Sequence, residues 1–348
     1  MELKRIAIDT SKHVFTVHGV DQAERAVLRR NLSRSQMEGF FAKQPPTEVA
    51  LEACGSSHHW GRMLEALGHR VRLIPPQYVK PFVKRGKNDR HDAAAISEAA
   101  SRPDMRFVPV KSADRQEQAM VLSARELLVR QRTQLINAVR GHAAEFGVIA
   151  PRGTAHVAAI LQKMADKEAG VPARAQQILA RLGHQIETLD DEIDALDKEM
   201  AAQHKASTGS KRLATAPGVG PILALTLTLC VDAAQFEDGR HFAAWLGLTP
   251  REKSTGGKQR MGKISREGNE RIRQCLVLGA TSVIKAVTRS GADKKASKLA
   301  TPWMLKLLER KPRKVAAVAL ANKMARVVWA MMTSGEAWRG ARSVPLVG

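Results

Sequence analysis

Alternation of apolar and polar residues dominates the first part of the chain and predicts strands. We expect five strands, at residues 4–9, 14–20, 25–32, 48–53 and 70–76. The first three follow one another closely, which predicts an antiparallel meander. The last two are separated by helical patterns, as parallel strands usually are. The pattern therefore predicts an α/β domain with a mixed sheet.

Helical patterns account for most of the remaining chain. In the α/β part they occur at 33–43, at 58–69 and from about 89 to 101, and the pattern turns helical again from 112 to 146. Residues 205–212 are small and polar and predict a linker. The stretch 270–333 is again mostly helical by its pattern.

Apolar residues between 172 and 205 recur at alternating spacings of four and three, which defines a heptad seam. The members of this seam are Leu182, Ile186, Leu189, Ile193, Leu196 and Met200. The seam covers only about three heptads, so an antiparallel hairpin within the chain competes with a coiled coil between chains. We predict three parts: an α/β domain at 1–110, a helical coiled-coil dimerisation region at 111–205 and a mainly α C-terminal domain at 206–348.

The distribution of charge indicates a polyanionic partner. The formal net charge is +22, and residues 201–348 hold 26 lysines and arginines against 9 acidic residues. Such asymmetry favours nucleic acid over a merely soluble basic surface. No apolar run of about 18 residues occurs, which argues against a membrane span. Three scattered cysteines, Cys54, Cys230 and Cys275, suit a reducing cytosol and exclude a cysteine-based zinc cluster.

Four carboxylates occupy related places in the α/β part. Asp9 ends the first strand and Glu52 the fourth, while Asp89 and Asp92 begin the helix after the fifth, three residues apart and on one face. Helix capping and the macrodipole are the ordinary explanation of such aspartates. That explanation suits one aspartate better than it suits the ordered set of four.

Carboxylates that converge repel one another, and divalent cations relieve the repulsion. Their hard oxygens suit Mg²⁺, or Mn²⁺, when phosphate is the substrate, and two such metals stabilise both oxygens of a phosphodiester exchange. We therefore favour a metal site. Four cations beside it are expected to hold the phosphate backbone; they are Lys84, Arg85, Lys87 and Arg90.

A second group of candidate residues lies in the basic segment 251–274. Ser254 and Thr255 precede Gly256 and Gly257, which permit tight turns and close approach of a phosphate. A serine there can attack a phosphodiester and hold a covalent intermediate. The alternative is an ordinary β-hairpin turn on a basic surface. The cations expected to contact nucleic acid are Lys258, Arg260, Lys263 and Arg266.

The stretch APGVGPILA, 216–224, contains the Gly-x-Gly turn of a helix–hairpin–helix motif. In that interpretation the backbone amides of Gly218 and Gly220 face a DNA phosphate. The alternative is an ordinary helix start with Pro221 at its first position.

These segments together resemble the DEDD-type transposases of insertion-sequence family "one-one-zero", which are described as bridge-RNA-guided recombinases. The motifs that carry the resemblance occur in order over nearly the whole chain: AIDTSKHVF, LEACGSSHHWGR, KNDRHDAAAI, PGVGPILALTL, FAAWLGLTP and STGGKQRMGKISREGNERIR. Each motif is short, but their ordered combination is highly specific. The resemblance implies a RuvC-like N-terminal domain with an RNase H-like fold.

The resemblance also implies roles and partners. Asp9, Glu52, Asp89 and Asp92 match the acidic tetrad that binds Mg²⁺, and Ser254 matches the nucleophilic serine, which forms a 5′-phosphoserine link to DNA. The tetrad and the serine are expected to come from different subunits of a homodimer or homotetramer. Donor DNA, target DNA and a noncoding guide RNA are the implied nucleic acids.

Two other functions fit parts of the sequence. A metal-dependent, structure-specific nuclease of the RuvC type would use water as its nucleophile, and the absence of a covalent protein–DNA adduct would identify it. A non-catalytic nucleic-acid-binding protein would use the acids only as helix caps, and it would show no specific Mg²⁺ binding that depends on Asp9. The ordered motifs favour a transposase that mobilises an insertion sequence.

Overall fold

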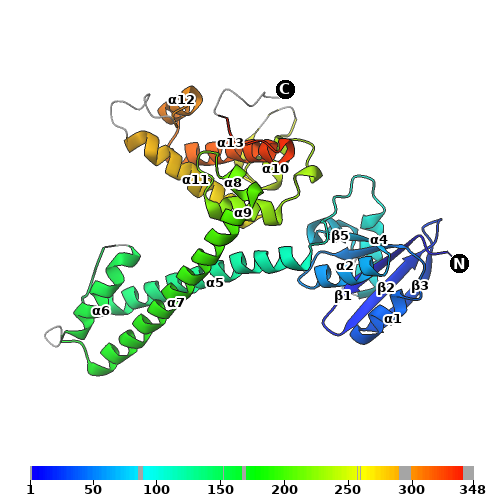
Figure 1. Ribbon diagram of the computed structural model, residues 1–348, viewed down its shortest axis with the longest axis horizontal. Coiled ribbons are helices and arrows are strands. Elements are labelled where there is room, and N and C mark those ends of the chain that lie inside the picture. The colour runs from blue at the N-terminus through cyan, green and yellow to red at the C-terminus, as the bar shows by residue number, and fades with distance from the viewer. Residues whose placement is uncertain are drawn as a thin grey trace. The chain divides into compact units, whose positions relative to one another are not determined.

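The computed structural model describes most of the chain. The described residues are 2–84, 89–151, 153–166, 170–256, 258, 260–289 and 299–339, with only the backbone given for Asp89 and Arg90. The chain forms two compact units, Met1–Gln116 and Glu117–Gly348, each with a hydrophobic core of its own. Figure 1 follows the chain by colour from the N-terminus to the C-terminus.

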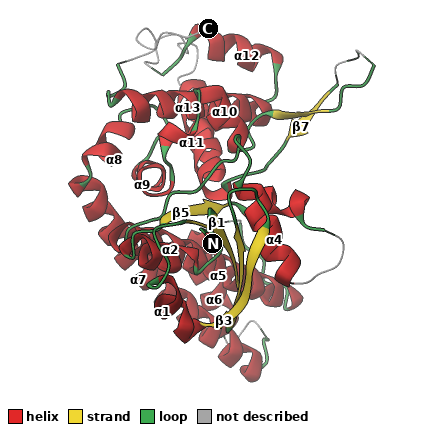
Figure 2. Ribbon diagram, turned by 90° about the vertical axis from the view of Figure 1, so that its right-hand side faces the viewer, coloured by secondary structure: helices red, strands yellow, loops and turns green. Residues whose placement is uncertain are grey.

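A five-stranded mixed sheet forms the centre of the first unit, drawn in yellow in Figure 2. Its strands are β1 (Arg5–Thr10), β2 (Val14–Val20), β3 (Ala26–Ser33), β4 (Glu48–Glu52) and β5 (Arg70–Ile74). Their order is β3-β2-β1-β4-β5, in which β1, β2 and β3 run antiparallel and β1, β4 and β5 run parallel. All five expected strands and the mixed directions are confirmed.

Helices cover both faces of this sheet. They are α1 (Met37–Phe41), preceded by a 3-10 turn at Arg34–Gln36, α2 (Ser57–Ala66), α3 (Pro76–Val79), followed by a 3-10 turn at Lys80–Phe82, and α4 (Asp89–Ala100). Because neighbouring side chains of a strand point to opposite faces, Ile8 packs with α1 and α2 whereas Ala7 packs with α4. The α4 face is lined mainly by small residues, among them Ala50, Ala95 and Ala99, which lets the helix lie close to the sheet.

Two long helices of opposite direction, α5 (Ala113–Glu145) and α7 (Ala173–Ala206), form a hairpin with α6 (Val157–Ala165) between them. Arg125 pairs with Asp197 at 3.1 Å. Seven residues further along α5, Arg132 pairs with Asp190, which lies seven residues earlier in α7. This pairing is antiparallel and lies within one chain.

The predicted heptad seam packs inside this hairpin. Its buried members are Ile186, Ile193 and Met200, and Leu179 extends the same stripe one heptad earlier. The other three predicted members, Leu182, Leu189 and Leu196, are only partly buried. The hairpin alternative is confirmed. No coiled coil is evident in the described part of the chain, because the apolar stripe of α7 is already occupied by α5 and α6.

Helices around a shared core form the rest of the second unit. They are α8 (Thr208–Leu213), α9 (Pro221–Cys230), α10 (Gly239–Trp245), α11 (Glu270–Arg289), α12 (Pro302–Arg310) and α13 (Arg313–Ser334). By length and composition alone α13 could cross a membrane. Its residues Ala317, Ala321 and Val328 pack in the helical core, which accounts for that composition.

One feature of this unit differs from the sequence-based expectation, and another matches an alternative that the sequence offered. The segment 205–212 is helical rather than a linker: α7 continues to Ala206, and Ser207 caps α8 by accepting the Ser210 N–H at 3.1 Å. The mainly α part also contains a short hairpin of β6 (Pro250–Glu252) and β7 (Met261–Ile264).

Candidate active site

Asp9 and Glu52 lie at the same level of two neighbouring parallel strands. β1 and β4 pair through Ile8 and Leu51, and the two acids are the residues that follow. Parallel neighbours are about 4.8 Å apart. Alternation places both acids on the face that α4 covers, the face of Ala7. Both side chains are partly buried.

Asp92 brings a third carboxylate to this face. It lies in the first turn of α4, four residues before Ile96, which is fully buried against the sheet, and residues four apart share a helix face. Burial raises the pKa of Glu52, and the negative charge of Asp92 raises that pKa further. Two like charges on this face oppose ionisation of both carboxylates unless a cation compensates.

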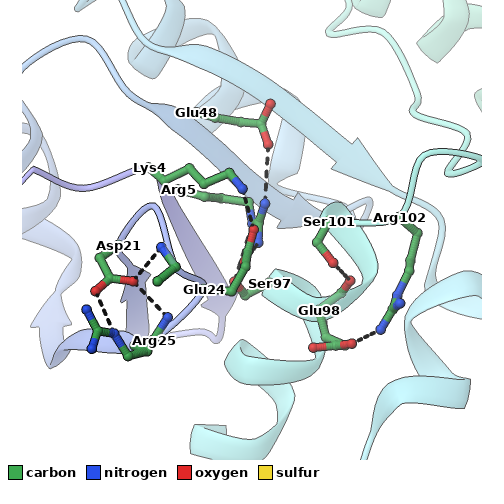
Figure 3. Close-up of polar contacts among 11 residues, drawn as sticks. Lys4, Arg5, Asp21, Glu24, Arg25, Glu48, Ser97, Glu98, Ser101 and Arg102 are labelled. Carbon is green, nitrogen blue, oxygen red and sulfur yellow. Dashed lines mark hydrogen bonds and ion pairs between the residues drawn. The ribbon is translucent and has the colours of Figure 1, made fainter.

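A buried arginine joins the three elements that carry these acids. The Arg5 side chain, 3% exposed, contacts Glu24, Glu48 and Ser97 (Figure 3). The Arg5 Nε donates to the Ser97 Oγ of α4 at 3.4 Å. The Arg5 Nη1 lies 3.9 Å from the Glu48 carboxylate of β4. One side chain of β1 therefore contacts both β4 and α4. These contacts hold α4 in place against the two strands that carry Asp9 and Glu52.

Two residues that the sequence did not indicate lie beside the acids. Thr10 follows Asp9, and its hydroxyl is 3.1 Å from the thiol of Cys54, two residues after Glu52. Burial raises the pKa of the Cys54 thiol, but hydrogen bonds from Thr10, Ser56 and nearby backbone N–H groups outweigh it, so the pKa is lowered. The parallel register of β1 and β4 brings these residues together, and strand pairing is the signal that could have found them.

The chemistry of the donor set suits a hard divalent cation, since its close members are carboxylates. Among the described side chains, no group of three or more histidines, cysteines, aspartates or glutamates could hold a metal ion as placed. The side chains of Asp89 and Arg90 lie outside the description, as do Arg85 and Lys87, while Lys84 is exposed. Convergence of all four predicted carboxylates therefore stays a prediction.

Ser254 lies on the hairpin of β6 and β7 in the second unit. The Lys253 N–H donates to the Arg260 carbonyl at 2.8 Å, and the Lys258 N–H donates to the Thr255 carbonyl at 3.1 Å. These bonds close the tight turn of a β-hairpin, and the role of Ser254 as a nucleophile stays a prediction. The turn presents the serine on an exposed loop rather than in a core.

The Ser254 hydroxyl makes one hydrogen bond as a donor and one as an acceptor. It donates to the Glu252 carboxylate at 2.6 Å and accepts the Arg260 N–H at 3.3 Å. Within the described residues, the Thr255 hydroxyl takes part in no hydrogen bond. The predicted cations around the turn are all exposed; they are Lys258, Arg260, Lys263 and Arg266. Gly256 adopts φ +56°, whereas Gly257 lies outside the described residues.

The base of this hairpin is held against the helical core. A Cβ on Gly268, whose φ is +73°, would lie 1.8 Å from the Trp245 carbonyl oxygen, so only glycine fits. Arg273 of α11 donates to the carbonyls of Leu246 at 3.1 Å and Glu267 at 2.7 Å. These contacts hold the base of the serine hairpin in place on the helical core.

The two glycines between α8 and α9 have different surroundings. Gly218 has φ +80°, and a Cβ there would lie 2.9 Å from the Gly279 carbonyl oxygen of α11, so this glycine serves helix packing. Gly220 is exposed, has no atom within 4 Å of a Cβ position, and precedes Pro221 at the first position of α9. Pro221 begins α9, as the helix-start alternative expects, while contact of Gly218 and Gly220 with a DNA phosphate stays a prediction.

An α/β unit with acids on one sheet face, followed by a basic and largely helical unit with an exposed serine, is the organisation expected of a DEDD-type DNA transposase. Residues 6–147 match the family DEDD_Tnp_IS110, described as "Transposase". Residues 210–296 match the family described as "Transposase IS116/IS110/IS902 family". The two matches cover the acid-bearing sheet and the serine hairpin.

Full-length relatives carry the same description. A protein of Sinorhizobium fredii named as a transposase, y4pF/y4sB, is 51% identical over 98% of this chain and 87% of its own length. A protein of Pseudomonas aeruginosa named as a family 20 transposase is 48% identical over 97% of this chain and 99% of its own. The transposase for insertion sequence element IS1111A of Coxiella burnetii is 37% identical over 97% and 92%.

The chain belongs to the IS110 family of transposases. It is accordingly a DNA transposase of an insertion sequence. Its first unit is an RNase H-like DEDD domain, which confirms the fold that the resemblance implied for this part.

Proposed function

We propose that this transposase is a site-specific recombinase in which Ser254 attacks a DNA phosphodiester held at the acidic group Asp9, Glu52, Asp89 and Asp92. The observation that supports the proposal is that paired strands and the first turn of α4 bring Asp9, Glu52 and Asp92 to one face of the sheet, where burial and the charge of Asp92 raise the pKa of Glu52. Such an arrangement is costly for a fold and is typical of sites that bind a cation and phosphate.

The acidic group would hold Mg²⁺ or Mn²⁺ through its carboxylate oxygens. A bound divalent metal supplies polarisation of the scissile phosphate and offsets its charge. The chain itself supplies close carboxylates on paired strands and on α4, with α4 joined to the strands by Arg5. Exposed cations would hold the phosphates on either side of the scissile one.

Ser254 would form a bond to phosphorus and displace the 3′ oxygen of the neighbouring nucleotide. The products are a 5′-phosphoserine link and a free 3′-hydroxyl. Because the link conserves the phosphodiester bond energy, a 3′-hydroxyl of another strand can reverse the reaction without ATP. That exchange between donor and target strands is the transposition step.

Donor and target DNA are the proposed substrates, and the resemblance adds a noncoding guide RNA that pairs with both. The proposed contacts are the exposed Lys84 and Gly220 and the cations of the serine hairpin. Arg85, Lys87, Arg90, Gly218, Gly256 and Gly257 complete the set inferred from the sequence. We further propose a homodimer or homotetramer, with residues 1–110 and 206–348 as the two chemical parts and 111–205 between them.

The test is to trap and map a covalent adduct. Purified protein, guide RNA, Mg²⁺ and labelled donor DNA should yield a protein–DNA adduct whose digestion maps the linkage to Ser254. Ser254→Ala should lose the adduct and recombination while it retains DNA binding. Linkage at Thr255 would assign the other hydroxyl. An active Ser254→Ala protein without an adduct would identify water as the nucleophile and a RuvC-type nuclease as the function.

A further inference from the structure

We propose that Glu252 is the catalytic base of the serine step: its carboxylate takes the Ser254 proton as the hydroxyl attacks phosphorus, and returns it when the link is broken. The inference rests on the proposed serine chemistry and adds the group that activates it. Glu252 is the last residue of β6 and lies two residues before Ser254. The Ser254 Oγ donates to Glu252 Oε1 at 2.6 Å.

The serine hydroxyl needs such a group because it is a weak nucleophile while it keeps its proton. A carboxylate that accepts a hydroxyl proton during phosphoryl transfer is an established solution, as in protein kinases. Glu252 already accepts the hydrogen that must leave. The Arg260 N–H donates to the same Oγ at 3.3 Å. This donor would stabilise the negative charge that develops on Oγ when it leaves phosphorus in the joining step.

The described partner of the Glu252 carboxylate is the Ser254 hydroxyl. The turn is rich in cations, yet no ion pair among the described residues includes Glu252. Its neighbour in the hairpin base, Glu267, differs because it pairs with Arg251 at 3.2 Å. The hydroxyl of Thr255 has no comparable acceptor within the described structure, so the contact also selects Ser254 over Thr255.

The proton of Ser254 moves in both the cleavage step and the joining step. The Ser254 Oγ–P bond forms, the P–O3′ bond breaks, the serine proton moves to Glu252, and the leaving 3′ oxygen keeps the electron pair and takes a proton from water. In the joining step a 3′-hydroxyl gives its proton to solvent hydroxide and attacks phosphorus, the Oγ–P bond breaks, and protonated Glu252 returns its proton to Oγ. The same residue is base in the first step and acid in the second, as microscopic reversibility requires.

Single-turnover rates of adduct formation with labelled donor DNA, guide RNA and Mg²⁺ test the proposal in Glu252→Gln, Glu252→Ala and wild-type protein. Both variants should form the Ser254 adduct about 10²- to 10⁴-fold more slowly, the range of general-base contributions. The wild-type rate should rise with pH as a carboxylate ionises, and the Gln variant should lack that limb. DNA affinity in a mobility-shift assay should stay within about 3-fold, because the lost group faces the serine.

The matched control is Glu267→Gln, which removes the same charge from the same hairpin without touching Ser254, and its adduct rate should equal that of wild type. A Glu252→Gln protein that reacts at the wild-type rate would overturn the inference, because the amide oxygen can orient the hydroxyl but cannot take its proton. That result would leave the proposed function intact. A wild-type protein that transfers strands without any serine adduct would overturn both.

Discussion

Glu52 and Asp92 oppose each other on the α4 side of the sheet, and no ion pair among the described residues includes either of them. A fold selected for stability alone would separate or pair such charges. Their proximity is therefore best understood as a requirement of the site, where a bound cation supplies the missing positive charge. Single substitutions at Glu52 and Asp92 can measure the effect of each charge.

Asp92→Asn should lower the pKa of Glu52. The negative charge of Asp92 is one of two causes that raise this pKa, and burial, the larger cause, is unchanged by an isosteric amide. The measurement is an NMR titration of the Glu52 side-chain carboxyl without divalent metal. The exposed Asp104, which is not a cause of the shift, provides the control Asp104→Asn. An unchanged titration in Asp92→Asn would mean that the two carboxylates are not close in solution.

Glu52→Gln should stabilise the metal-free protein at pH 7 by about 0.5–2 kcal/mol, the usual gain from removing one unfavourable functional group. The sign follows from linkage: a raised folded-state pKa means that the native state binds the proton more tightly. Stability from this group is present at low pH and is lost as pH rises from about 4.3 through the folded-state pKa. Thermal melts with and without Mg²⁺ check this.

The same thermal melts also test whether Glu52 binds the metal. Mg²⁺ should raise the melting temperature of wild type and have a smaller effect on Glu52→Gln, since a ligand that binds only the native state stabilises it. A variant that is less stable than wild type without metal, or an equal Mg²⁺ effect in both proteins, would contradict the assignment of Glu52 to a cation site.

At the scale of elements, close packing of α11 against the α8–α9 turn depends on two glycines. A Cβ on Gly279 would lie 2.0 Å from the Gly218 carbonyl oxygen, which is backbone and cannot move aside cheaply. Gly279→Ala should therefore cost about 1–3 kcal/mol of stability, as overpacking usually does. Gly220→Ala, at an open position of the same turn, should change stability by less than about 0.5 kcal/mol. Chemical denaturation measures the free energy of unfolding of both variants. Equal losses of stability would refute the steric explanation for Gly279.

The helical hairpin makes a second prediction at this scale. Ile193, 3% exposed, lies in the buried stripe of α7, so Ile193→Ala should destabilise the protein by about 2–5 kcal/mol. The control is Ile178→Ala on the same helix, where the side chain is 49% exposed and the loss should be below about 0.5 kcal/mol. Because the stripe packs within the chain, light scattering should give an unchanged mass for Ile193→Ala. A lower mass would indicate a coiled coil between chains.

Across the whole molecule, the local pattern of apolar residues predicted the strands and the helix faces, but not the contacts between distant segments. Alternation located the five strands, and heptad spacing located the stripe of α7, but spacing alone could not say whether its partner was α5 or another chain. Residues 205–212 were mistaken for a linker because Ser207 is equally good as a turn residue and as a helix cap. The Thr10–Cys54 contact and the Arg5 network depend on strand register, which is a long-range property. The hydrogen bond from Ser254 to Glu252 depends on a rotamer that sequence does not specify.

The net charge of +22 yields a prediction for the complete protein. Each DNA phosphate that the protein neutralises contributes about −0.9 to the slope of log K against log salt. The triple variant Lys258→Ala, Arg260→Ala, Lys263→Ala should therefore bind more weakly and show a slope shallower by up to about 3. Fluorescence anisotropy with duplex donor DNA between about 50 and 200 mM salt measures both quantities.

The control for this measurement removes the same charge from another surface of the second unit. Lys198, Lys205 and Lys211 are exposed residues of α7 and α8, and changing all three to alanine lowers the net charge equally. If binding depended only on total charge, both triple variants would lose the same slope. We expect the loss only in the hairpin variant, because counterion release counts phosphates in contact rather than charge at a distance. Equal slopes in the two variants would show that the serine hairpin is not the surface that meets the DNA backbone.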